Sequence, residues 1–78
     1  MILSECPPRT QSRIVSVDVG SRYRLRLKEL GLRPGAHFYV VNRAAFGGVV
    51  INIAGTRIAV DHRSARSIAV EKVTEAVA

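Results

Sequence analysis

Residues 26–35 read Arg-Leu-Lys-Glu-Leu-Gly-Leu-Arg-Pro-Gly and predict a change of direction and of secondary structure within ten residues. A glycine after a helical turn commonly adopts the left-handed backbone conformation that ends a helix, and an apolar residue beyond it packs back on the last turn. We therefore expect Gly31 to end a helix and Leu32 to lie against Leu27. This arrangement would fix where the helix stops and where the chain goes next.

The next residues predict a strand. Pro34 followed by Gly35 suits a tight turn, because proline presets the first central position and glycine accepts a positive φ at the second. Residues 36–43 are then mostly apolar, β-branched or aromatic, as in a strand. The corner between helix and strand is thus defined by six residues: Leu27, Leu30, Gly31, Leu32, Pro34 and Gly35.

The segment before Gly31 shows two periodicities. Part of it alternates polar and apolar residues as a strand does, but Tyr23, Leu27 and Leu30 lie at helical spacing. Ser21 stands where a helix-capping side chain is favoured. We predict a helix over residues 21–30, capped by Ser21.

The chain before the helix predicts one strand and an arm. Residues 13–19 are rich in β-branched side chains, with Val15, Val17 and Val19 on one face. Residues 1–12 contain two adjacent prolines and polar neighbours, which favour an extended arm over a helix or a central strand.

The chain after residue 43 predicts a loop with paired glycines and three further strands. The first two strands should pair antiparallel through a two-residue turn at Gly55 and Thr56. Asp61 can cap a short turn before the last strand, which would bury Ile68 and Val70. The three strands cover residues 49–54, 57–60 and 67–73, and residues 74–78 are expected to fray.

These elements predict a mainly β fold: a small, partly open five-stranded barrel of SH3-like type, with one helix inserted after the first strand. Closing so small a sheet removes most of its exposed edges. A chain of 78 residues fits a single domain over residues 1–78. Hydrophobic residues make up 47% of the chain but aromatic ones only 5%, so the core must be aliphatic and has little room for a deep ligand cavity.

The chain carries 12 basic and 6 acidic residues, a formal net charge of +6, which makes an acidic partner plausible. The basic residues are scattered as in a solvated surface, with one local concentration. We hypothesise that two features contact a more acidic partner, a basic helix face and a glycine loop. Their residues are Arg22, Arg24, Arg26 and Lys28 on the helix, and Phe46, Gly47 and Gly48 in the loop.

Reactive side chains are too scattered to predict an enzyme or a metal site. His62 follows Asp61, but adjacent side chains at such a junction usually point apart. Cys6 lies in the arm, far in sequence from His37 and His62, and no zinc or iron ligand spacing is present. We expect no catalytic residues, no bound metal and no cofactor.

The sequence also lacks the signals of a membrane or secreted protein. Cys6 is the only cysteine, so no internal disulfide forms, and no apolar run approaches the roughly 20 residues of a membrane span. Its first residues lack the basic start and apolar core of a signal peptide. We expect a cytoplasmic protein that does not insert into a membrane.

The corner at residues 26–35 resembles the Arg-Leu-x-Glu-Leu-Gly-Leu-x-Pro-Gly pattern of the FeoA family. The likeness extends from about residue 3 to residue 70 and includes the two adjacent prolines, the glycine pair Gly47-Gly48 and the strand at residues 50–54. The resemblance implies an SH3-like cytosolic accessory of bacterial ferrous iron uptake, which binds or regulates FeoB, a membrane permease with a cytosolic GTP-binding domain. It implies no iron bound by the chain itself.

Two alternatives remain open. A small basic barrel could bind RNA, although Tyr23, Phe38, Tyr39 and Phe46 are the only aromatic residues available for stacking on bases, and one of Phe38 and Tyr39 must enter the core. The domain also resembles the C-terminal SH3-like module of metal-dependent repressors. The chain lacks the DNA-binding helices that precede that module, which favours a free-standing FeoA. Its oligomeric state does not follow from the sequence.

Overall fold

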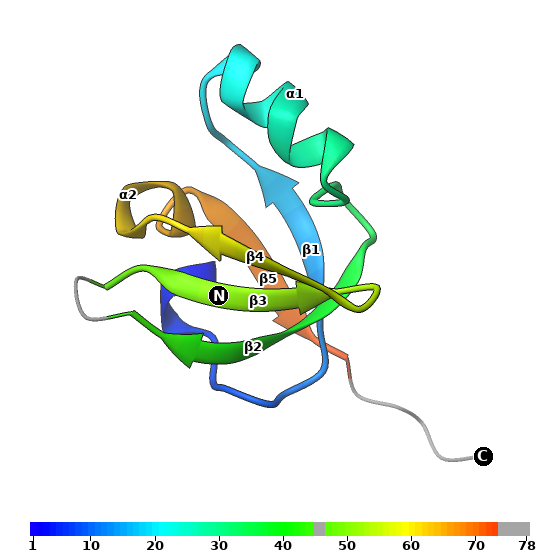
Figure 1. Ribbon diagram of the computed structural model, residues 1–78, viewed down its shortest axis with the longest axis vertical. Coiled ribbons are helices and arrows are strands. Elements are labelled where there is room, and N and C mark those ends of the chain that lie inside the picture. Colours follow the sequence, from blue (N-terminus) through cyan, green and yellow to red (C-terminus); the bar gives the residue numbers. More distant parts are fainter. Residues whose placement is uncertain (45–46, 74–78) are drawn as a thin grey trace.

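The computed structural model describes residues 1–44 and 47–73, and it confirms the mainly β fold with a helix after the first strand (Figure 1). Five antiparallel strands form one open sheet in the order β4-β3-β2-β1-β5. The strands are β1 (Ser12–Val17), β2 (His37–Arg43), β3 (Val49–Ile53), β4 (Thr56–Val60) and β5 (Ile68–Lys72). The helical elements are the 3-10 turn η1 (Leu3–Glu5), α1 (Ser21–Glu29) and the short α2 (His62–Ala65).

The helix-ending corner is confirmed in its backbone detail. Gly31 has φ +106°, and its N–H donates to the carbonyl of Lys28 at 3.0 Å. The Leu32 N–H donates to the carbonyl of Leu27 at 2.8 Å, and both leucine side chains are buried. These two bonds are the pair that defines a Schellman motif, so the end of α1 is held by hydrogen bonds and by core burial together.

The turn into β2 is also as predicted. Gly35 has φ +90°, and the N–H of Ala36 donates to the carbonyl of Arg33 at 3.0 Å. With Pro34 before the glycine, this is a type II turn. β2 begins two residues later, at His37.

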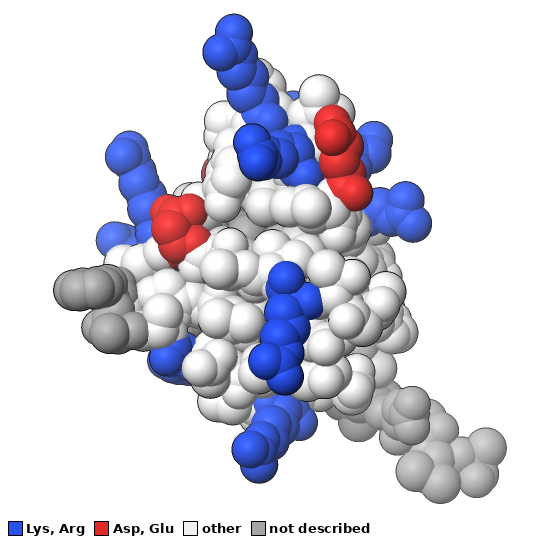
Figure 2. Space-filling model, viewed as in Figure 1, with Lys and Arg blue, Asp and Glu red and all other residues white. Residues whose placement is uncertain are grey.

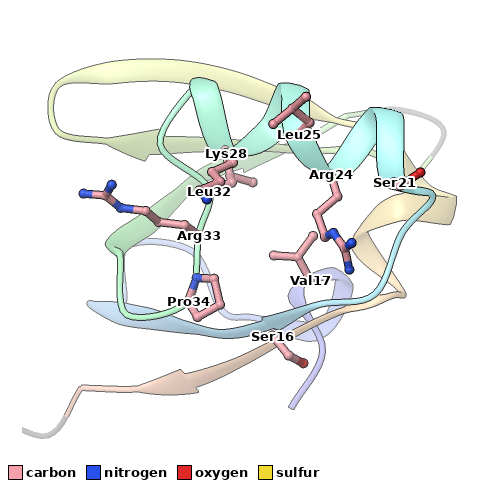
Figure 3. A pocket seen from close by; sticks show the side chains of 9 residues that line it. All are labelled: Ser16, Val17, Ser21, Arg24, Leu25, Lys28, Leu32, Arg33 and Pro34. Carbon is pink, nitrogen blue, oxygen red and sulfur yellow. The ribbon is translucent and has the colours of Figure 1, made fainter.

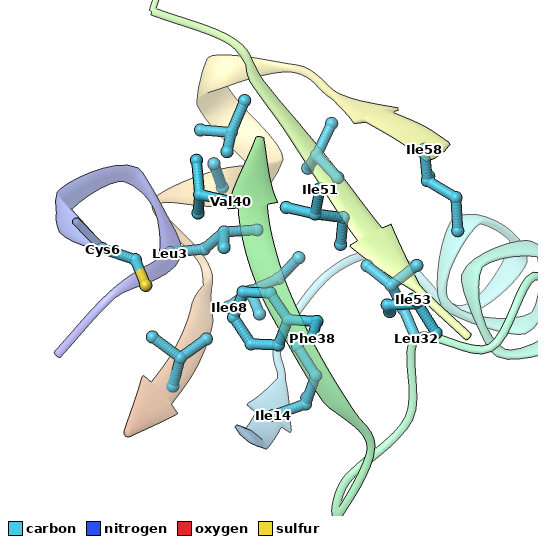
Figure 4. Packing of buried hydrophobic residues seen from close by; sticks show 14 of the residues in the cluster. Leu3, Cys6, Ile14, Leu32, Phe38, Val40, Ile51, Ile53, Ile58 and Ile68 are labelled. Carbon is cyan, nitrogen blue, oxygen red and sulfur yellow. The ribbon is translucent and has the colours of Figure 1, made fainter. Parts of the chain in front are cut away.

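The core is aliphatic and contains one aromatic side chain (Figure 4). Phe38 is buried while its neighbour Tyr39 is half-buried, as the alternation along a strand requires. β3 buries Val49, Ile51 and Ile53, and β5 buries Ile68 and Val70, as predicted. The described part of the sheet therefore wraps around a packed, mostly aliphatic interior.

The predicted apolar face of β1 is wrong at Val15, whereas Val17 and Val19 do contact the core. Ile14 and Val17 are buried, whereas the side chain of Val15 is 47% exposed. The pairing of β1 with β5 shifts register between Ile14 and Ser16. A bulge adds one residue to a strand and reverses the alternation of its faces, so inward-facing residues no longer differ by two.

The β3–β4 hairpin is antiparallel as predicted, but its turn lies one residue earlier. Ile53 pairs with Thr56, so the two-residue turn consists of Ala54 and Gly55, not Gly55 and Thr56. Ala54 has φ +51° and Gly55 has φ +84°. Two successive positive φ angles make a type I′ turn, whose twist matches that of paired strands.

The expectation of an extended arm over residues 1–12 is also corrected. Leu3 and Cys6 are buried in the core, and the Val70 N–H donates to the carbonyl of Met1 at 2.7 Å. Leu3 points from the N-terminal segment toward β2 in Figure 4. A small sheet gains stability by covering its edge and filling its open end, which outweighs the extended preference of the two prolines.

The two helix starts differ. Asp61 caps α2 as predicted, since its Oδ2 accepts from the Ser64 N–H at 3.1 Å, and Ala65 is buried. Ser21 does not cap α1, because the N-cap residue is Gly20 and no side-chain bond is made there. Ser21 is instead the first residue inside the helix.

Candidate docking surface

Helix α1 is held to the barrel by few side chains. Leu27 is its only buried residue, and Tyr23 is half-buried, with its hydroxyl donating to Asp61 Oδ1 at 3.2 Å. Two leucines on the same helix remain open to solvent: Leu25 is 59% exposed and Leu30 46%. Most of the α1 surface is therefore free for contacts beyond this chain.

The four basic residues of α1 do not form one face, which corrects that part of the hypothesis. Arg24 and Lys28 border the space between α1 and β1, whereas Arg22 and Arg26 border a shallow depression on the other flank with Glu29. Helix residues four apart share a face, but residues two apart point in nearly opposite directions. The even spacing along the sequence therefore produces two basic flanks.

The flank with Arg24 and Lys28 lines an open groove of about 590 Å³, which we call the α1–β1 groove (Figure 3). Val17 points from β1 toward the helix, Arg24 reaches from the helix toward β1, and Arg33 extends outward at one end. The groove is lined by Ser16, Val17, Ser21, Arg24, Leu25, Lys28, Leu32, Arg33 and Pro34.

The groove lies where the barrel opens. β1 pairs with β2 only at Ser12 and Arg13, while its later residues Ser16 and Val17 pair with β5 alone. The chain then leaves the sheet to form α1, so the gap between β1 and β2 is bridged by the helix and its following corner.

Charge around α1 has one sign on the groove side. Three of the nine lining residues are basic and none is acidic. The one ion pair in the part of the chain that the structure describes joins Arg13 to Glu71, on the distant β1–β5 pair. Figure 2 shows basic side chains gathered around the end of the molecule that carries α1, with others spread elsewhere.

The glycine loop packs against the β4–α2 junction. Gly47 has φ +82°, and its carbonyl oxygen lies 3.2 Å from His62 Nδ1. A Cβ atom on Gly47 would come within 2.8 Å of that nitrogen. Phe46, the predicted apolar anchor of this loop, lies outside the described residues. The backbone angle therefore favours glycine at position 47, and a Cβ there would also require the exposed side chain of His62 to move.

Asp61 and His62 point apart, as expected for adjacent residues at a junction. Hydrogen bonds from the Ser64 side chain and backbone N–H lower the pKa of Asp61, and the Tyr23 hydroxyl contributes in the same direction. His62 faces the glycine loop instead. The pair links α1 to that loop and forms no carboxylate–imidazole couple.

The candidate metal-binding side chains lie apart. Cys6 is buried, with its Sγ 3.3 Å from Ser12 Oγ, while His37 and His62 are exposed on different elements. Over residues 1–44 and 47–73, no three His, Cys, Asp or Glu side chains come together as metal ligands. No helix in the same ranges has the length and apolar character needed to cross a bilayer.

Seven of the nine groove residues, Leu25, Arg33 and Val17 among them, were missing from the partner surface predicted from the sequence. The helical period alone could have joined Leu25 and Lys28 to Arg24 and separated them from Arg22, since the spacing is visible in the sequence. Val17 and Arg33 enter the groove only because β1 and the helix-ending corner meet in the fold.

The comparisons with known proteins agree with this fold. A family model described as the FeoA domain matches residues 1–72. The solution structure of FeoA from Chlorobium tepidum is 29% identical, with a TM-score of 0.88, over 95% of this chain and 71% of that one. A zinc complex of FeoA from Stenotrophomonas maltophilia, described as a prokaryotic SH3 domain protein, is 30% identical, with a TM-score of 0.74, over 91% of this chain and 89% of that one.

A manganese-dependent transcriptional repressor shares the fold alone. It is 18% identical with a TM-score of 0.79, and the match covers 94% of this chain but 36% of the repressor. A comparison with curated protein sequences found no match. The fold is thus SH3-like, and the family model covers nearly all of the described residues. This chain belongs to the FeoA family.

Proposed function

We propose that the chain is a cytoplasmic accessory of bacterial ferrous iron uptake that acts by binding the cytosolic GTP-binding domain of the membrane permease FeoB. The single observation that carries this proposal is the FeoA domain match over residues 1–72. For the S. maltophilia relative, a role as a bacterial ferrous iron transport activating factor has been suggested.

The surface of α1 supports action by docking. A helix that buries one leucine while exposing Leu25 and Leu30 among arginines has the composition of a protein interface, where apolar anchors stand within a polar rim. The reactive side chains in the described residues are scattered and suggest no enzymatic reaction. We therefore propose an adaptor and not an enzyme.

RNA binding is the rival function, favoured by the net charge of +6. A stacking platform needs aromatic side chains on the basic surface. Of the four aromatic residues, Phe38 is buried, Tyr23 is bonded to Asp61 and Tyr39 is half-buried on β2. None of these three lines the α1–β1 groove, so a protein partner is better supported than RNA.

The test uses calorimetry to measure direct binding of the purified chain to the cytosolic domain of the FeoB encoded in the same genome. We expect saturable binding that persists at physiological salt, since apolar anchors resist screening. A single-stranded RNA is titrated in parallel. Binding to RNA with a steep salt dependence, and none to the FeoB domain, would replace the adaptor by an RNA-binding protein.

The cellular counterpart is deletion of the gene and growth with ferrous iron as the limiting iron source. Slower growth, restored by the wild-type chain and by excess ferric chelate taken up through another route, is the expected result. Equal growth of the deletion and parent strains on limiting ferrous iron contradicts a role in its uptake.

A further inference from the structure

We infer that the α1–β1 groove binds a short, extended, acidic segment of the partner protein, with apolar side chains against the groove floor and carboxylates against its basic rim. This inference rests on the proposed function for the identity of the protein that supplies the segment, and on the groove itself for the chemistry of the segment.

The floor of the groove is apolar. Val17 and Leu32, two core residues that are 9% and 1% exposed, lie at its base, and the exposed Leu25 on its helix wall supplies most of the accessible apolar surface. An apolar side chain buried in such a site stabilises the complex by removal of its surface from water. A partner side chain such as leucine would bury itself and cover Leu25 in the same step.

The basic residues along the edge of the groove favour a negatively charged segment. Arg24 and Lys28 lie one helical turn apart on the same side, and like charges at this spacing destabilise a helix. Arg33 adds a third cation at one end, and no acidic residue lines the groove. Carboxylates of a bound segment would offset this repulsion, so charge complementarity points to an acidic partner.

The dimensions favour an extended segment. The nine residues of α1 rise about 14 Å along the helix axis. An extended chain advances about 3.3 Å per residue, so about four residues span the helix. Alternate residues of such a segment face opposite sides, which places apolar side chains on the floor and carboxylates toward the rim.

The lining also argues against a nucleic acid in this groove. Its apolar residues are Val17, Leu25, Leu32 and Pro34, and none is aromatic. Sequence-tolerant binding of single strands depends on bases stacking against aromatic rings. An oligonucleotide would meet the cations but find no stacking surface.

The experiment is a fluorescence-anisotropy titration of the full chain with a labelled peptide of alternating Asp and Leu. Two comparison peptides replace Leu by Ser or Asp by Asn. We expect the Asp-Leu peptide to bind best, because it alone satisfies both floor and rim. Equal affinity for the Asp-Ser peptide would reduce the groove to a charged surface and overturn the inference.

The two flanks of α1 supply a matched pair of variants. The groove variant is Arg24→Glu with Lys28→Glu, and the control is Arg22→Glu with Arg26→Glu, which makes the same charge change on the same exposed helix. We expect the groove variant to weaken peptide binding by about tenfold or more, and the control by much less, since like charges facing across an interface are strongly unfavourable.

Three results would overturn the inference. One is no binding of the Asp-Leu peptide to the wild-type chain, and another is an equal loss in both variants, which would indicate attraction by net charge alone. The third is a single-stranded RNA that binds with the groove dependence expected of the peptide. Thermal unfolding of each variant separates loss of binding from loss of the fold.

The same variants distinguish this inference from the proposed function. If the wild-type chain and both variants bind the FeoB cytosolic domain equally, the proposed function holds and the groove is not its docking site. If the chain binds the Asp-Leu peptide through the groove but not the FeoB domain, the groove holds and the partner is a different acidic protein.

Discussion

The two ends of helix α1 are held by different forces. At its C-terminal end, the side chains of Leu27 and Leu32 are buried and two backbone hydrogen bonds, of 2.8 and 3.0 Å, close the helix around Gly31. At its N-terminal end, Gly20 provides no side-chain cap, and the hydroxyl of Tyr23 reaches an exposed carboxylate, Asp61.

The two ends of α1 therefore contribute unequally to its attachment. Burial of two leucines contributes several kcal/mol, whereas one exposed hydrogen bond contributes about 1 kcal/mol. The corner therefore contributes most to the attachment of the helix, and Tyr23, which is partly buried against the core, contributes less. The surface that we propose for docking extends from the firmly held end toward the loosely held one.

The largest expected effect is at the firmly held end. Leu27→Ala should lower the free energy of unfolding by about 2–5 kcal/mol, because it removes buried surface and leaves a cavity under the helix. Leu25→Ala, two residues away but exposed, is the matched control and should change stability by less than about 0.5 kcal/mol. Urea unfolding followed by circular dichroism measures both. Similar losses in the two variants would show that α1 is not held at one leucine.

A smaller effect is expected at the helix-ending glycine. Gly31→Ala should destabilise by about 1–2 kcal/mol for its left-handed backbone. It should lose slightly more than Gly35→Ala, because a Cβ at position 31 lies 3.2 Å from Ile53 Cγ2 and one at position 35 meets nothing within 4 Å. Comparing the unfolding free energies of the two variants separates the cost of the left-handed backbone from the cost of the contact with Ile53. An equal or smaller loss of stability in Gly31→Ala than in Gly35→Ala would show that the Ile53 side chain can move at no cost in free energy.

The smallest effect is expected at the loosely held end and depends on pH. Hydrogen bonds from Ser64, and then from Tyr23, lower the pKa of Asp61 below its ordinary value. The ionised carboxylate therefore stabilises the fold above that value, and this contribution is lost as pH falls through the lowered pKa. Wild type should exceed Asp61→Asn in stability near pH 7, and the difference should shrink as pH falls below the ordinary pKa of an aspartate and through the lowered one.

Tyr23→Phe is the control for that comparison. It removes one of the lesser donors to Asp61, so most of the pH dependence should remain while the N-terminal end of α1 loses its tether. Urea unfolding at a series of pH values measures the three proteins together. Loss of the whole pH dependence in Tyr23→Phe would show that Tyr23, and not Ser64, holds the charge of Asp61.

Local patterns predicted the elements well and their faces less well. The helical spacing of the leucines correctly predicts α1. The hypothesis of one basic face at residues 22–28 is wrong, because residues two apart on the predicted helix already point to opposite flanks. The face of β1 failed for a different reason, because the bulge after Ile14 depends on pairing with β5, more than fifty residues later.

The packing of the N-terminal segment likewise could not be predicted from local patterns. Two prolines favour an extended chain locally, yet Leu3 and Cys6 are buried against strands that lie far along the sequence. Leu25 and Arg33 could be seen as exposed candidates from the helical period and the corner, but not as parts of one groove. That requires the position of Val17 across the gap in the barrel.

The sequence by itself determined the corner at residues 26–35, the type of each main element, the composition of the core and the likeness to the FeoA family. These follow from interactions between residues close in the chain: a left-handed glycine, a proline turn and the periods of apolar residues. Only the tertiary structure decided the packing of the N-terminal segment, the face of β1 and the groove between α1 and β1. Those depend on contacts between distant segments, whose free energy arises when the chain closes on its core and has no local signature.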